Sequence, residues 1–491
     1  MGTTGKKREE LRFIVMGAGM AGILSGIKLR EAGFSDITIY EKADRIGGTW
    51  RENTYPGLTC DVDSHSYTYT FEPNPDWSHR FPPGDEIQAY FEATTTQYGV
   101  DEMVRFNEEV VRCAHEGGRW QLQMKSGLRD EADVVIAATG VLHHLNWPDI
   151  EGLDSFEGAM FHSARWDHDV PLDGQRVGII GNGSTGVQIV SALAPRAAEL
   201  YHFQRTAQWI MASENPAYTE EEKAAFRANP QLMRDIKEGF DRGEGLAKFS
   251  EALADAESPM MKEIEATVRE NLENSVQDAA LRERLRPTYR AACKRMIFSP
   301  DYYEAIQHPN AELVTDPIER VERKGVRLES GRLIELDVLA LATGFKADRF
   351  MRPMELIGRG GVNLEDVWAK RPVAYLSISI PDFPNFFMLN GPNGPVGNFS
   401  LIDIAERQMA YISQLIEPIA EGRCREVSAS SAAMARFDEE RVEAAKSTIW
   451  ASGCKSWYLD AEGIPASWPW SQRRFHEEMN QPRLEDYQLI E

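Results

Sequence analysis

The chain has 491 residues, of which 42% are hydrophobic and 27% charged, and its formal net charge is −23. This length exceeds one ordinary hydrophobic core and predicts two or three globular domains. The negative charge argues against a nucleic acid partner and against a polybasic membrane surface. No run reaches the ~18 apolar residues of a membrane span, and no apolar signal segment precedes the first predicted strand, so we expect a cytoplasmic protein.

Five cysteines are scattered along the chain, and none of them forms a CxxC pair. An odd, dispersed set is typical of reduced thiols in a cytosol. Without a redox-active pair, a flavin-dependent disulfide reductase is excluded as a function class. The sequence therefore predicts reduced cysteines.

The first predicted unit is a strand at 11–16, a loop that reads Gly17-Ala-Gly19-Met-Ala-Gly22, a helix, and a second strand at 37–40. In such a loop the first glycine allows the tight turn, the second admits a pyrophosphate, and the third lets helix and strand pack closely. The pyrophosphate would lie at the helix N-terminus. Glu41 ends the second strand, 24 residues after Gly17, where a carboxylate can hold ribose hydroxyls. This unit is predicted to bind a dinucleotide.

Residues 47–61 follow, with paired glycines at 47–48 and a Tyr-Pro-Gly turn at 55–57. These turns would let backbone lie flat against a planar ligand, although an ordinary surface loop is the alternative. A further buried strand, 133–138, leads into Thr139-Gly140.

The segment 156–167 reads FEGAMFHSARWD and joins the first unit to a second one. Its aromatic, glycine and histidine spacings suit neither a helix nor a strand. We interpret it as a polar linker that could hinge the two units, with a plain surface connector as the alternative.

The second unit repeats the pattern: a strand at 175–180, the loop Gly181-Asn-Gly183-Ser-Thr-Gly186, a helix, and a strand at 200–204. Arg205 lies 24 residues after Gly181, at the offset that Glu41 has in the first unit. A carboxylate there would repel a 2′-phosphate, whereas a guanidinium binds it in bidentate fashion. The first unit is therefore predicted to bind FAD and the second NADPH.

The remaining chain completes the predicted architecture. Residues 219–286 are helical and charged, opened by the capping box Thr219-x-x-Glu222, and we interpret them as structural cover that could also border a substrate entrance. A second strand ending in Thr-Gly closes the NADP unit at 337–344. The predicted fold class is α/β, with two Rossmann-like dinucleotide-binding domains and an inserted helical subdomain. The predicted boundaries are 1–146 for the first part of the FAD domain, 147–346 for the NADP domain and 347–491 for the return to the FAD domain with the C-terminal tail.

Two motifs resemble one enzyme family. The spacing F-x-G-x-x-x-H-x-x-x-W-D is similar to the fingerprint of the type I Baeyer–Villiger monooxygenases, and here it comprises Phe156, Gly158, His162, Trp166 and Asp167. Related flavin-containing N- and S-monooxygenases carry Phe or Tyr and then Lys at the last two places. Residues 48–61 also match the family's second signature, G-x-W-x-x-x-x-Y-P-G-x-x-x-D.

The resemblance implies specific site residues. Those expected at FAD are Gly17, Gly19, Gly22, Glu41, Gly48, Thr49, Trp50, Asp61, Tyr67 and Val110. Those expected at NADP are Thr59, Cys60, Gly181, Asn182, Gly183, Ser184, Thr185, Gly186, Gln188, Arg205, Thr206, Lys294, Arg295 and Trp457. Without the resemblance, the basic pair 294–295 would be interpreted as a solvated patch.

The activity implied by the resemblance is oxidation of ketones to esters or lactones by a peroxyflavin, with dioxygen and NADPH consumed and sulfides as further substrates. Arg295 would stabilise the peroxy anion and the tetrahedral oxyanion, and Asp61 would pair with it. His162 and Trp166 would act through conformation. The alternatives are an N- or S-oxygenating flavin monooxygenase and an NADPH oxidase. No metal site is predicted, because His143 and His144 lack further ligands at suitable spacing. A monomer or a homodimer is expected, and the particular ketone is not indicated.

Overall fold

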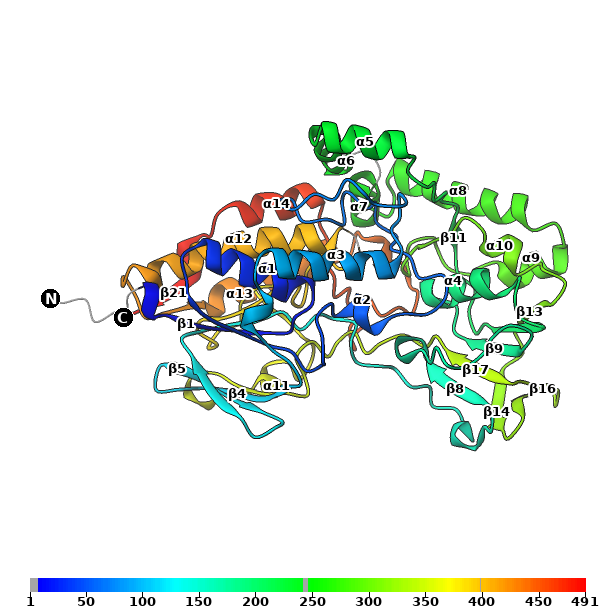
Figure 1. Ribbon diagram of the computed structural model, residues 1–491, viewed down its shortest axis with the longest axis horizontal. Helices are drawn as coiled ribbons and strands as arrows, with labels where there is room; N and C mark the ends of the chain where they lie inside the picture. The colour runs from blue at the N-terminus through cyan, green and yellow to red at the C-terminus, as the bar shows by residue number, and fades with distance from the viewer. Residues whose placement is uncertain (1–7, 242–245, 398) are drawn as a thin grey trace.

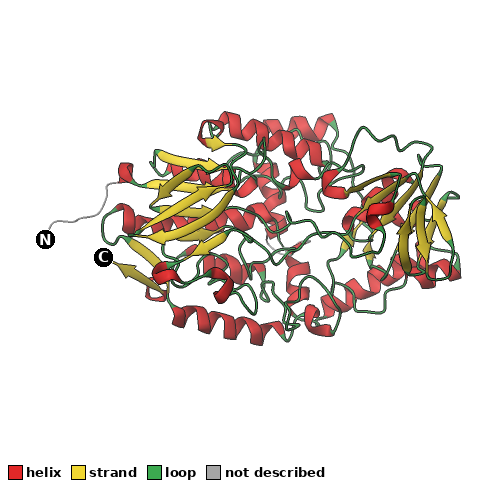
Figure 2. Ribbon diagram, turned by 90° about the horizontal axis from the view of Figure 1, so that it is seen from below, coloured by secondary structure: helices red, strands yellow, loops and turns green. Residues whose placement is uncertain are grey.

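The computed structural model describes residues 8–241, 246–397 and 399–491. The expectation about the N-terminal start and a small part of the predicted helical insertion fall on residues 1–7 and 242–245, outside the described ranges. Figure 1 shows two lobes along the long axis, with the first described residues and the C-terminus at the same end of the first lobe. In Figure 2 the strands gather in two groups at opposite ends of that axis.

The first lobe is built on a five-stranded parallel sheet with the order β19-β7-β1-β2-β3. Alternate side chains of β1 enter two different cores, since Phe13 and Val15 face one and Ile14 and Met16 the other. Helices α1 and α12 pack together in the first core, and the sheet β18-β4-β5-β6 covers the opposite face. The strands are β1 (Arg12–Met16), β2 (Asp36–Tyr40), β3 (Val104–Arg105), β4 (Val110–Glu116), β5 (Arg119–Met124), β6 (Arg129–Ala132), β7 (Val134–Ala137), β18 (Glu355–Ile357) and β19 (Phe386–Met388). The helices are α1 (Met20–Glu31), α2 (Thr49–Glu52), α3 (Gly84–Gln97), α11 (Leu364–Val367) and α12 (Leu401–Ala420).

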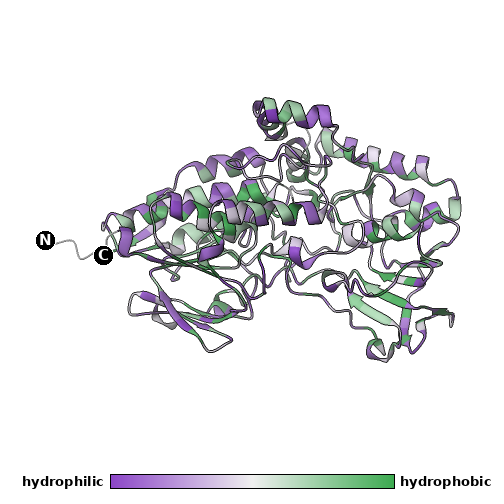
Figure 3. Cartoon of the chain, viewed as in Figure 1, coloured by the Kyte–Doolittle hydropathy of each residue, from purple (hydrophilic) through white to green (hydrophobic). Residues whose placement is uncertain are grey.

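The second lobe repeats this plan with a parallel sheet in the order β13-β10-β9-β17-β8. Its strands are β8 (Ala159–His162), β9 (Arg176–Ile180), β10 (Glu199–Phe203), β13 (Ala311–Val314) and β17 (Val338–Leu341), with helix α4 (Ser184–Leu193) on one face. An antiparallel sheet of β14 (Ile318–Glu322), β15 (Gly325–Leu328) and β16 (Leu333–Glu335) shares a core with the opposite face. In Figure 3 the strands of this lobe are largely hydrophobic, while the helices alternate in hydropathy as expected of helices with one buried face. The predicted α/β class with two Rossmann-like units is confirmed.

The segment 156–167 is not the irregular linker that its spacing predicts. Residues 159–162 form β8 at the edge of the second sheet, in parallel register with 338–341 of β17, and a short 3-10 helix, Ser163–Arg165, follows. The prediction was wrong because a four-residue edge strand is stabilised by long-range pairing, which leaves little periodic signal in the sequence.

The predicted helical insertion is present. It contains α5 (Glu220–Ala228), α6 (Gln231–Asp241), α7 (Leu246–Ala254), α8 (Pro259–Ser275) and α9 (Ala279–Leu285). The capping box is confirmed, because Thr219 N donates to Glu222 at 2.7 Å and Glu222 N donates to Thr219 Oγ1 at 3.2 Å. The short parallel pair of β11 (Ile210–Met211) and β12 (Ile297–Phe298) brings the two ends of the insertion together, and α10 (Tyr302–Ala305) follows.

The cysteines differ from the expectation of reduced thiols. Cys293 and Cys454 form a disulfide with their Cα atoms 6.1 Å apart, although 161 residues separate them in sequence. Cys60, Cys113 and Cys424 are free and buried. The pairing was missed because no local spacing marks two cysteines that only the tertiary fold brings together.

The C-terminal part of the chain packs back onto the first lobe. Strands β20 (Glu426–Ala429) and β21 (Tyr487–Ile490) pair in antiparallel fashion, and α13 (Ser431–Ala445) and α14 (Gln472–Asn480) lie between them in sequence. Phe437 of α13 and Phe475 of α14 belong to the same core as α1. Among the described residues, no helix is long and apolar enough to cross a bilayer.

Candidate functional site

A cavity of about 460 Å³ is lined by residues from both lobes. Its lining includes residues of the first glycine loop, of the start of α4 in the second lobe and of the C-terminal segment near Tyr458. The predicted site residues that line it are Gly17, Gly19, Glu41, Gly48, Thr49, Trp50, Thr59, Cys60, Asp61, Tyr67, Val110, Ser184, Thr185, Gln188, Arg295 and Trp457. The described chain therefore assembles most of the predicted FAD residues and part of the predicted NADP residues around one space.

The first glycine loop places the start of α1 at this cavity. A Cβ on Gly22 would overlap the Gly17 carbonyl oxygen, so only glycine allows helix and loop to pack this closely. Gly19 and Gly48 also face each other, since a Cβ on Gly48 would lie 3.1 Å from Gly19 Cα. The result is a backbone cradle at a helix N-terminus, the arrangement that binds pyrophosphate.

Glu41 is buried and belongs to a network of charges. Its carboxylate accepts hydrogen bonds from Ala18 N at 2.7 Å and from Arg51 Nη1 at 3.2 Å. Arg51 also pairs with Glu52, and Glu52 pairs with Arg165 of the fingerprint segment. A continuous chain of alternating charges therefore links the first glycine loop to the second lobe.

The second glycine loop is held by neutral groups. His202, fully buried, has Nδ1 3.1 Å from the Tyr302 hydroxyl and donates from Nε2 to Gly181 O at 3.1 Å. Burial lowers the pKa of His202 to about 4, so the ring is neutral near pH 7. Asn182 Nδ2 donates to Gln204 Oε1 at 3.0 Å and to the Thr206 carbonyl at 2.7 Å.

A pair of cations lies close to the second loop but outside the cavity lining. Arg205 is exposed directly after β10, and Lys294 Nζ stands 4.6 Å from the Tyr289 ring centroid. Burial and the charge of Arg205 lower the pKa of Lys294. Two neighbouring cations of this kind can bind an anion such as a phosphate.

Gln188 of α4 connects the two lobes. It accepts from the Tyr55 hydroxyl at 2.8 Å, and its Nε2 donates to the Thr59 carbonyl and hydroxyl oxygens, each at 3.1 Å. Gly57 packs against the Gln188 backbone, because a Cβ there would lie 2.7 Å from its carbonyl oxygen. Residues 55–60 are thus aligned along the start of the second lobe.

Arg295 and Asp61 form an ion pair in the cavity wall. Arg295 Nη2 donates to Asp61 Oδ2 at 2.6 Å. The charge of Asp61 raises the pKa of Arg295, so the guanidinium keeps its positive charge. Burial raises the pKa of the neighbouring Cys60 thiol and of the Tyr67 hydroxyl, which accepts from Trp50 Nε1 at 3.0 Å. A fixed cation among neutral groups can stabilise negative charge that develops in the cavity.

The fingerprint residues lie behind the cavity rather than in its lining. His162 is fully buried, accepts from Ala164 N at 3.1 Å, and donates from Nε2 to Gly344 O at 3.1 Å. It thereby supports the turn that presents Phe345 to the cavity. Trp166 packs edge-on against Phe161 at 4.6 Å, whereas Asp167 is exposed and caps a turn through Asp169 N. The predicted residues that do not line the cavity are Phe156, Gly158, His162, Trp166, Asp167, Gly22, Gly181, Asn182, Gly183, Gly186, Arg205, Thr206 and Lys294.

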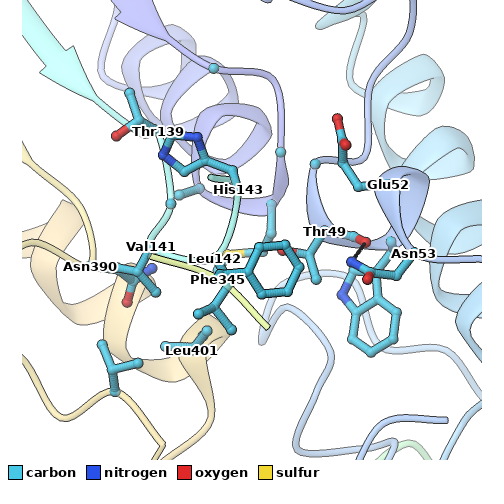
Figure 4. A pocket seen from close by; sticks show the side chains of 18 of the residues that line it. Thr49, Glu52, Asn53, Thr139, Val141, Leu142, His143, Phe345, Asn390 and Leu401 are labelled. Carbon is cyan, nitrogen blue, oxygen red and sulfur yellow. Dashed lines mark hydrogen bonds between the residues drawn. The ribbon is translucent and has the colours of Figure 1, made fainter. Parts of the chain in front are cut away.

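Several lining residues were not predicted. Figure 4 shows Thr139, Val141, Leu142 and His143 around the end of β7, with Asn390, Leu401 and Phe345 near them. In the same view Asn53 donates to the Thr49 carbonyl at 2.9 Å. The segment 139–143 could have been found, because ligands bind beyond the carboxyl ends of parallel strands. Others come from distant segments without a local signal: Phe249, Leu253, Met296, Phe298, Trp450 and Tyr458. Phe249 and Leu253 belong to α7, so the helical insertion is more than cover for the second sheet.

Within residues 8–241, 246–397 and 399–491 no group of three or more His, Cys, Asp or Glu side chains could hold a metal ion. His143 Nε2 bonds to the Phe350 carbonyl at 2.8 Å, and its Nδ1 lies 3.3 Å from Lys42 Nζ.

A family model described as pyridine nucleotide-disulphide oxidoreductase matches residues 14–227. This range contains both glycine loops but neither cysteine of the disulfide. An uncharacterised monooxygenase of Mycobacterium tuberculosis is 44% identical over 97% of this chain and 95% of its own length. A Baeyer–Villiger monooxygenase of Streptomyces coelicolor is 35% identical over 98% of this chain and 93% of its own, and one of Pseudomonas aeruginosa is 33% identical over 91% and 85%.

Solved structures resemble the whole chain as well. Cyclohexanone monooxygenase from Rhodococcus sp. Phi1 bound to NADP+ has a TM-score of 0.87 at 28% identity, covering 98% of this chain and 99% of that one. The OTEMO complex with FAD and NADP has a TM-score of 0.88 at 26% identity, covering 99% and 100%. Because identity above 30% extends over nearly the full length of curated relatives, the resemblance seen in the two motifs is confirmed, and the chain belongs to the family of type I Baeyer–Villiger monooxygenases.

Proposed function

We propose that the protein is an NADPH- and dioxygen-dependent flavin monooxygenase that converts ketones to esters or lactones and oxidises sulfides as a secondary activity. The observation that carries this proposal is the Arg295–Asp61 pair, which faces a cavity lined by the first glycine loop and the start of α4. Relatives named as Baeyer–Villiger monooxygenases and similar structures that hold FAD and NADP support it.

The residues at the first glycine loop suit FAD. The backbone cradle of Gly19 and Gly48 leaves space that a Cβ would fill, and the start of α1 faces the same space. Glu41 would contact the ribose, and Trp50 and Tyr67 would border the ring. The further residues we assign to FAD are Gly17, Gly22, Thr49, Asp61 and Val110. Bound there and reduced by NADPH, the flavin would activate dioxygen for insertion beside the ketone carbonyl.

The second lobe suits NADPH. Ser184 and Thr185 start α4 at the cavity, and Gln188 follows one turn later. Arg205 and Lys294 would bind the 2′-phosphate, which makes NADPH rather than NADH the reductant. Those we also assign to NADP are Thr59, Cys60, Gly181, Asn182, Gly183, Gly186, Thr206, Arg295 and Trp457. The domain boundaries proposed with this assignment are 1–146 and 347–491 for FAD and 147–346 for NADP, and the pairing of β19 with β7 supports them.

Arg295 is the residue to which we assign the main catalytic role. Asp61 fixes one edge of its guanidinium, so the cation needs little reorganisation when negative charge develops on the ketone oxygen. The apolar lining by Phe249, Leu253 and Phe298 excludes water and strengthens that interaction. His162 and Trp166 would act indirectly, by holding the turn at 343–345 and the edge of the second sheet.

The proposal is tested with the purified, FAD-loaded protein, NADPH, ¹⁸O-labelled dioxygen and a panel of cyclic and linear ketones. We expect an ester or lactone with one labelled oxygen, and a loss of at least about 100-fold in its rate of formation for Arg295→Ala. Arg112→Ala is the control, because this arginine pairs with Glu355 on the exposed sheet of the first lobe.

Two other outcomes would contradict the proposal. NADPH consumption that ends only in hydrogen peroxide would indicate an NADPH oxidase. Oxidation of amines or sulfides without any reaction of ketones would indicate a heteroatom oxygenase.

A further inference from the structure

We propose that Tyr458 is a positioning residue that holds Arg295 as a second support beside Asp61, and that the Cys293–Cys454 disulfide is the covalent part of this support. The inference rests on the proposed function, because it concerns the guanidinium to which the chemistry is assigned.

The first observation is that Tyr458 and Arg295 meet at Gly397. The Tyr458 hydroxyl lies beside the Arg295 guanidinium at Gly397, and the Nη2 of the same guanidinium donates to Asp61 at 2.6 Å. A Cβ on Gly397 would overlap the Tyr458 hydroxyl and would lie 2.9 Å from Arg295 Nη1. Gly397 has φ of +87°, so its conformation also favours glycine. The loop therefore leaves room for this one contact between tyrosine and arginine.

The second observation is that the Tyr458 ring is fixed. It is 3% exposed, stacks on Trp457 at 4.2 Å and lies 5.2 Å from the Trp450 ring. Its carbonyl accepts from Ala466 N at 2.7 Å. Trp457 is 43% exposed and faces the cavity, so the two neighbouring aromatic residues have different tasks.

The third observation is the covalent tie. Cys293 precedes Arg295 by two residues, and Cys454 precedes Tyr458 by four. Both cysteines are buried in the second core, together with Trp450 and Tyr458. The disulfide thus joins the backbone that carries the arginine to the backbone that carries its tyrosine partner.

The need for two supports follows from the shape of a guanidinium. It is a planar group with five N–H donors, and one carboxylate bond leaves rotation about that bond free. A second bond at another edge fixes the plane. Burial raises the pKa of Tyr458, so the hydroxyl remains neutral and can accept a hydrogen bond from Arg295 without adding a negative charge that would compete for the cation.

The test compares Tyr458→Phe with the wild type and with Tyr411→Phe. Tyr411 is equally buried, but its hydroxyl meets Tyr487 in the first lobe, away from the cavity lining. The measurements on the FAD-loaded protein are the ester formed per NADPH consumed, the ketone KM, and the NADP+ dissociation constant from the flavin absorbance change. For Tyr458→Phe we expect about tenfold less ester per NADPH, with hydrogen peroxide as the balance, and about tenfold weaker NADP+ binding. The ketone KM should change less than about twofold, and Tyr411→Phe should match the wild type.

We call the ester formed per NADPH consumed the coupling. If Tyr458→Phe had the same coupling and the same NADP+ affinity as the wild type, the positioning role would be overturned. A wild type that forms no ester would instead refute the proposed function, and the NADP+ titration would still decide the role of Tyr458. Gly397→Ala gives a second route if Tyr458→Phe does not fold, because its methyl group would displace the tyrosine hydroxyl and Arg295 Nη1. Gly397→Ala should also form less ester per NADPH consumed than the wild type, and an unchanged ratio would count against the proposal.

The covalent part has its own measurement. Thiol titration of the denatured wild type should give three thiols, since two of the five cysteines are bonded, whereas five thiols would overturn this part. The double variant Cys293→Ser/Cys454→Ser should lose coupling by about threefold or more, while Cys424→Ser, which removes a free buried thiol, should not. Wild-type coupling in the double variant would show that the bond does not position Arg295.

Discussion

The two glycine loops of the molecule have the same backbone plan and opposite electrostatics. In both, the third glycine packs on the carbonyl of the first, so a Cβ on Gly22 or on Gly186 would overlap that oxygen. In the first loop, the amide N–H of Ala18 donates a hydrogen bond to the buried carboxylate of Glu41. The second is held by neutral His202, and the charged residue at the matching offset, Arg205, stays exposed.

The difference separates what shapes a nucleotide loop from what selects its ligand. Glycines shape both loops, because only they allow the close packing. In the assignment proposed above, the residue that follows the second strand would select the ligand, because it would act on the ribose or its phosphate. In the first lobe that residue is also tied through Arg51 and Glu52 to Arg165 of the second lobe, which suits a cofactor that stays bound. In the second lobe Arg205 is exposed, which suits the proposed binding of a cofactor that enters and leaves.

Breaking the charge network that links Glu41 through Arg51 and Glu52 to Arg165 should have the largest effect on the protein. In Glu41→Gln, the buried guanidinium of Arg51 loses one of its two carboxylates, so we expect unfolding free energy to fall by about 3 kcal/mol. FAD content should fall with it, because the Ala18 amide loses its charged acceptor. The measurements are the flavin-to-protein absorbance ratio and thermal unfolding.

The matched control is Glu312→Gln at the other end of the molecule. The Glu312 side chain is 40% exposed and pairs with the similarly exposed Arg332, so its loss should change stability by no more than about 0.5 kcal/mol. Full FAD content in Glu41→Gln would show that the network is not needed to hold the first loop.

Removing the exposed cation of the second loop should have the next largest effect. In Arg205→Ala we expect the KM for NADPH to rise about 10- to 100-fold while the KM for NADH stays the same, because only the 2′-phosphate loses a partner. The ratio of kcat/KM for the two cofactors is the measurement. Arg196→Ala, which removes another exposed arginine paired with Asp173, should leave the ratio unchanged. If Arg205→Ala kept the wild-type preference, the phosphate would have to be assigned to Lys294 alone.

The features that could be predicted from the sequence are those that a local sequence pattern encodes. Strand, glycine loop and helix lie consecutively, so both loops and the equal offsets of Glu41 and Arg205 were visible without a structure. The pairing of Arg295 with Asp61 was expected from the family resemblance, and the structure places the two groups 2.6 Å apart.

The rest depends on contacts between distant segments. The edge strand at 159–162 exists because it pairs with 338–341, and the disulfide joins positions 161 residues apart. The contact between Tyr458 and Gly397 needs two loops that tertiary packing brings together. Tyr458 stands directly beside the predicted Trp457, but nothing in the sequence indicates that its hydroxyl reaches Arg295. The domain boundaries and the roles of the site residues stay predictions.

The neutral histidine under the second loop gives the smallest expected effect and the most direct contrast with the first loop. The pKa of His202 is about 4 in the folded protein and about 6.5 when unfolded. The unfolded chain therefore binds more protons between these values, and stability from this residue is present above pH 6.5 and lost as the pH falls. At pH 5.5 the loss is about 1.4 kcal/mol, one pKa unit below the unfolded value. The free energy of unfolding is measured in urea at pH 7.5 and at pH 5.5. The difference between the two values should be smaller in His202→Gln than in the wild type by this amount, whatever the stability of the variant at pH 7.5. His308→Gln, which removes an exposed histidine, should keep the wild-type difference. An unchanged difference in His202→Gln would mean that His202 takes up its proton as readily in the folded protein as in the unfolded chain, so that the second loop would tolerate a charged ring at pH 5.5.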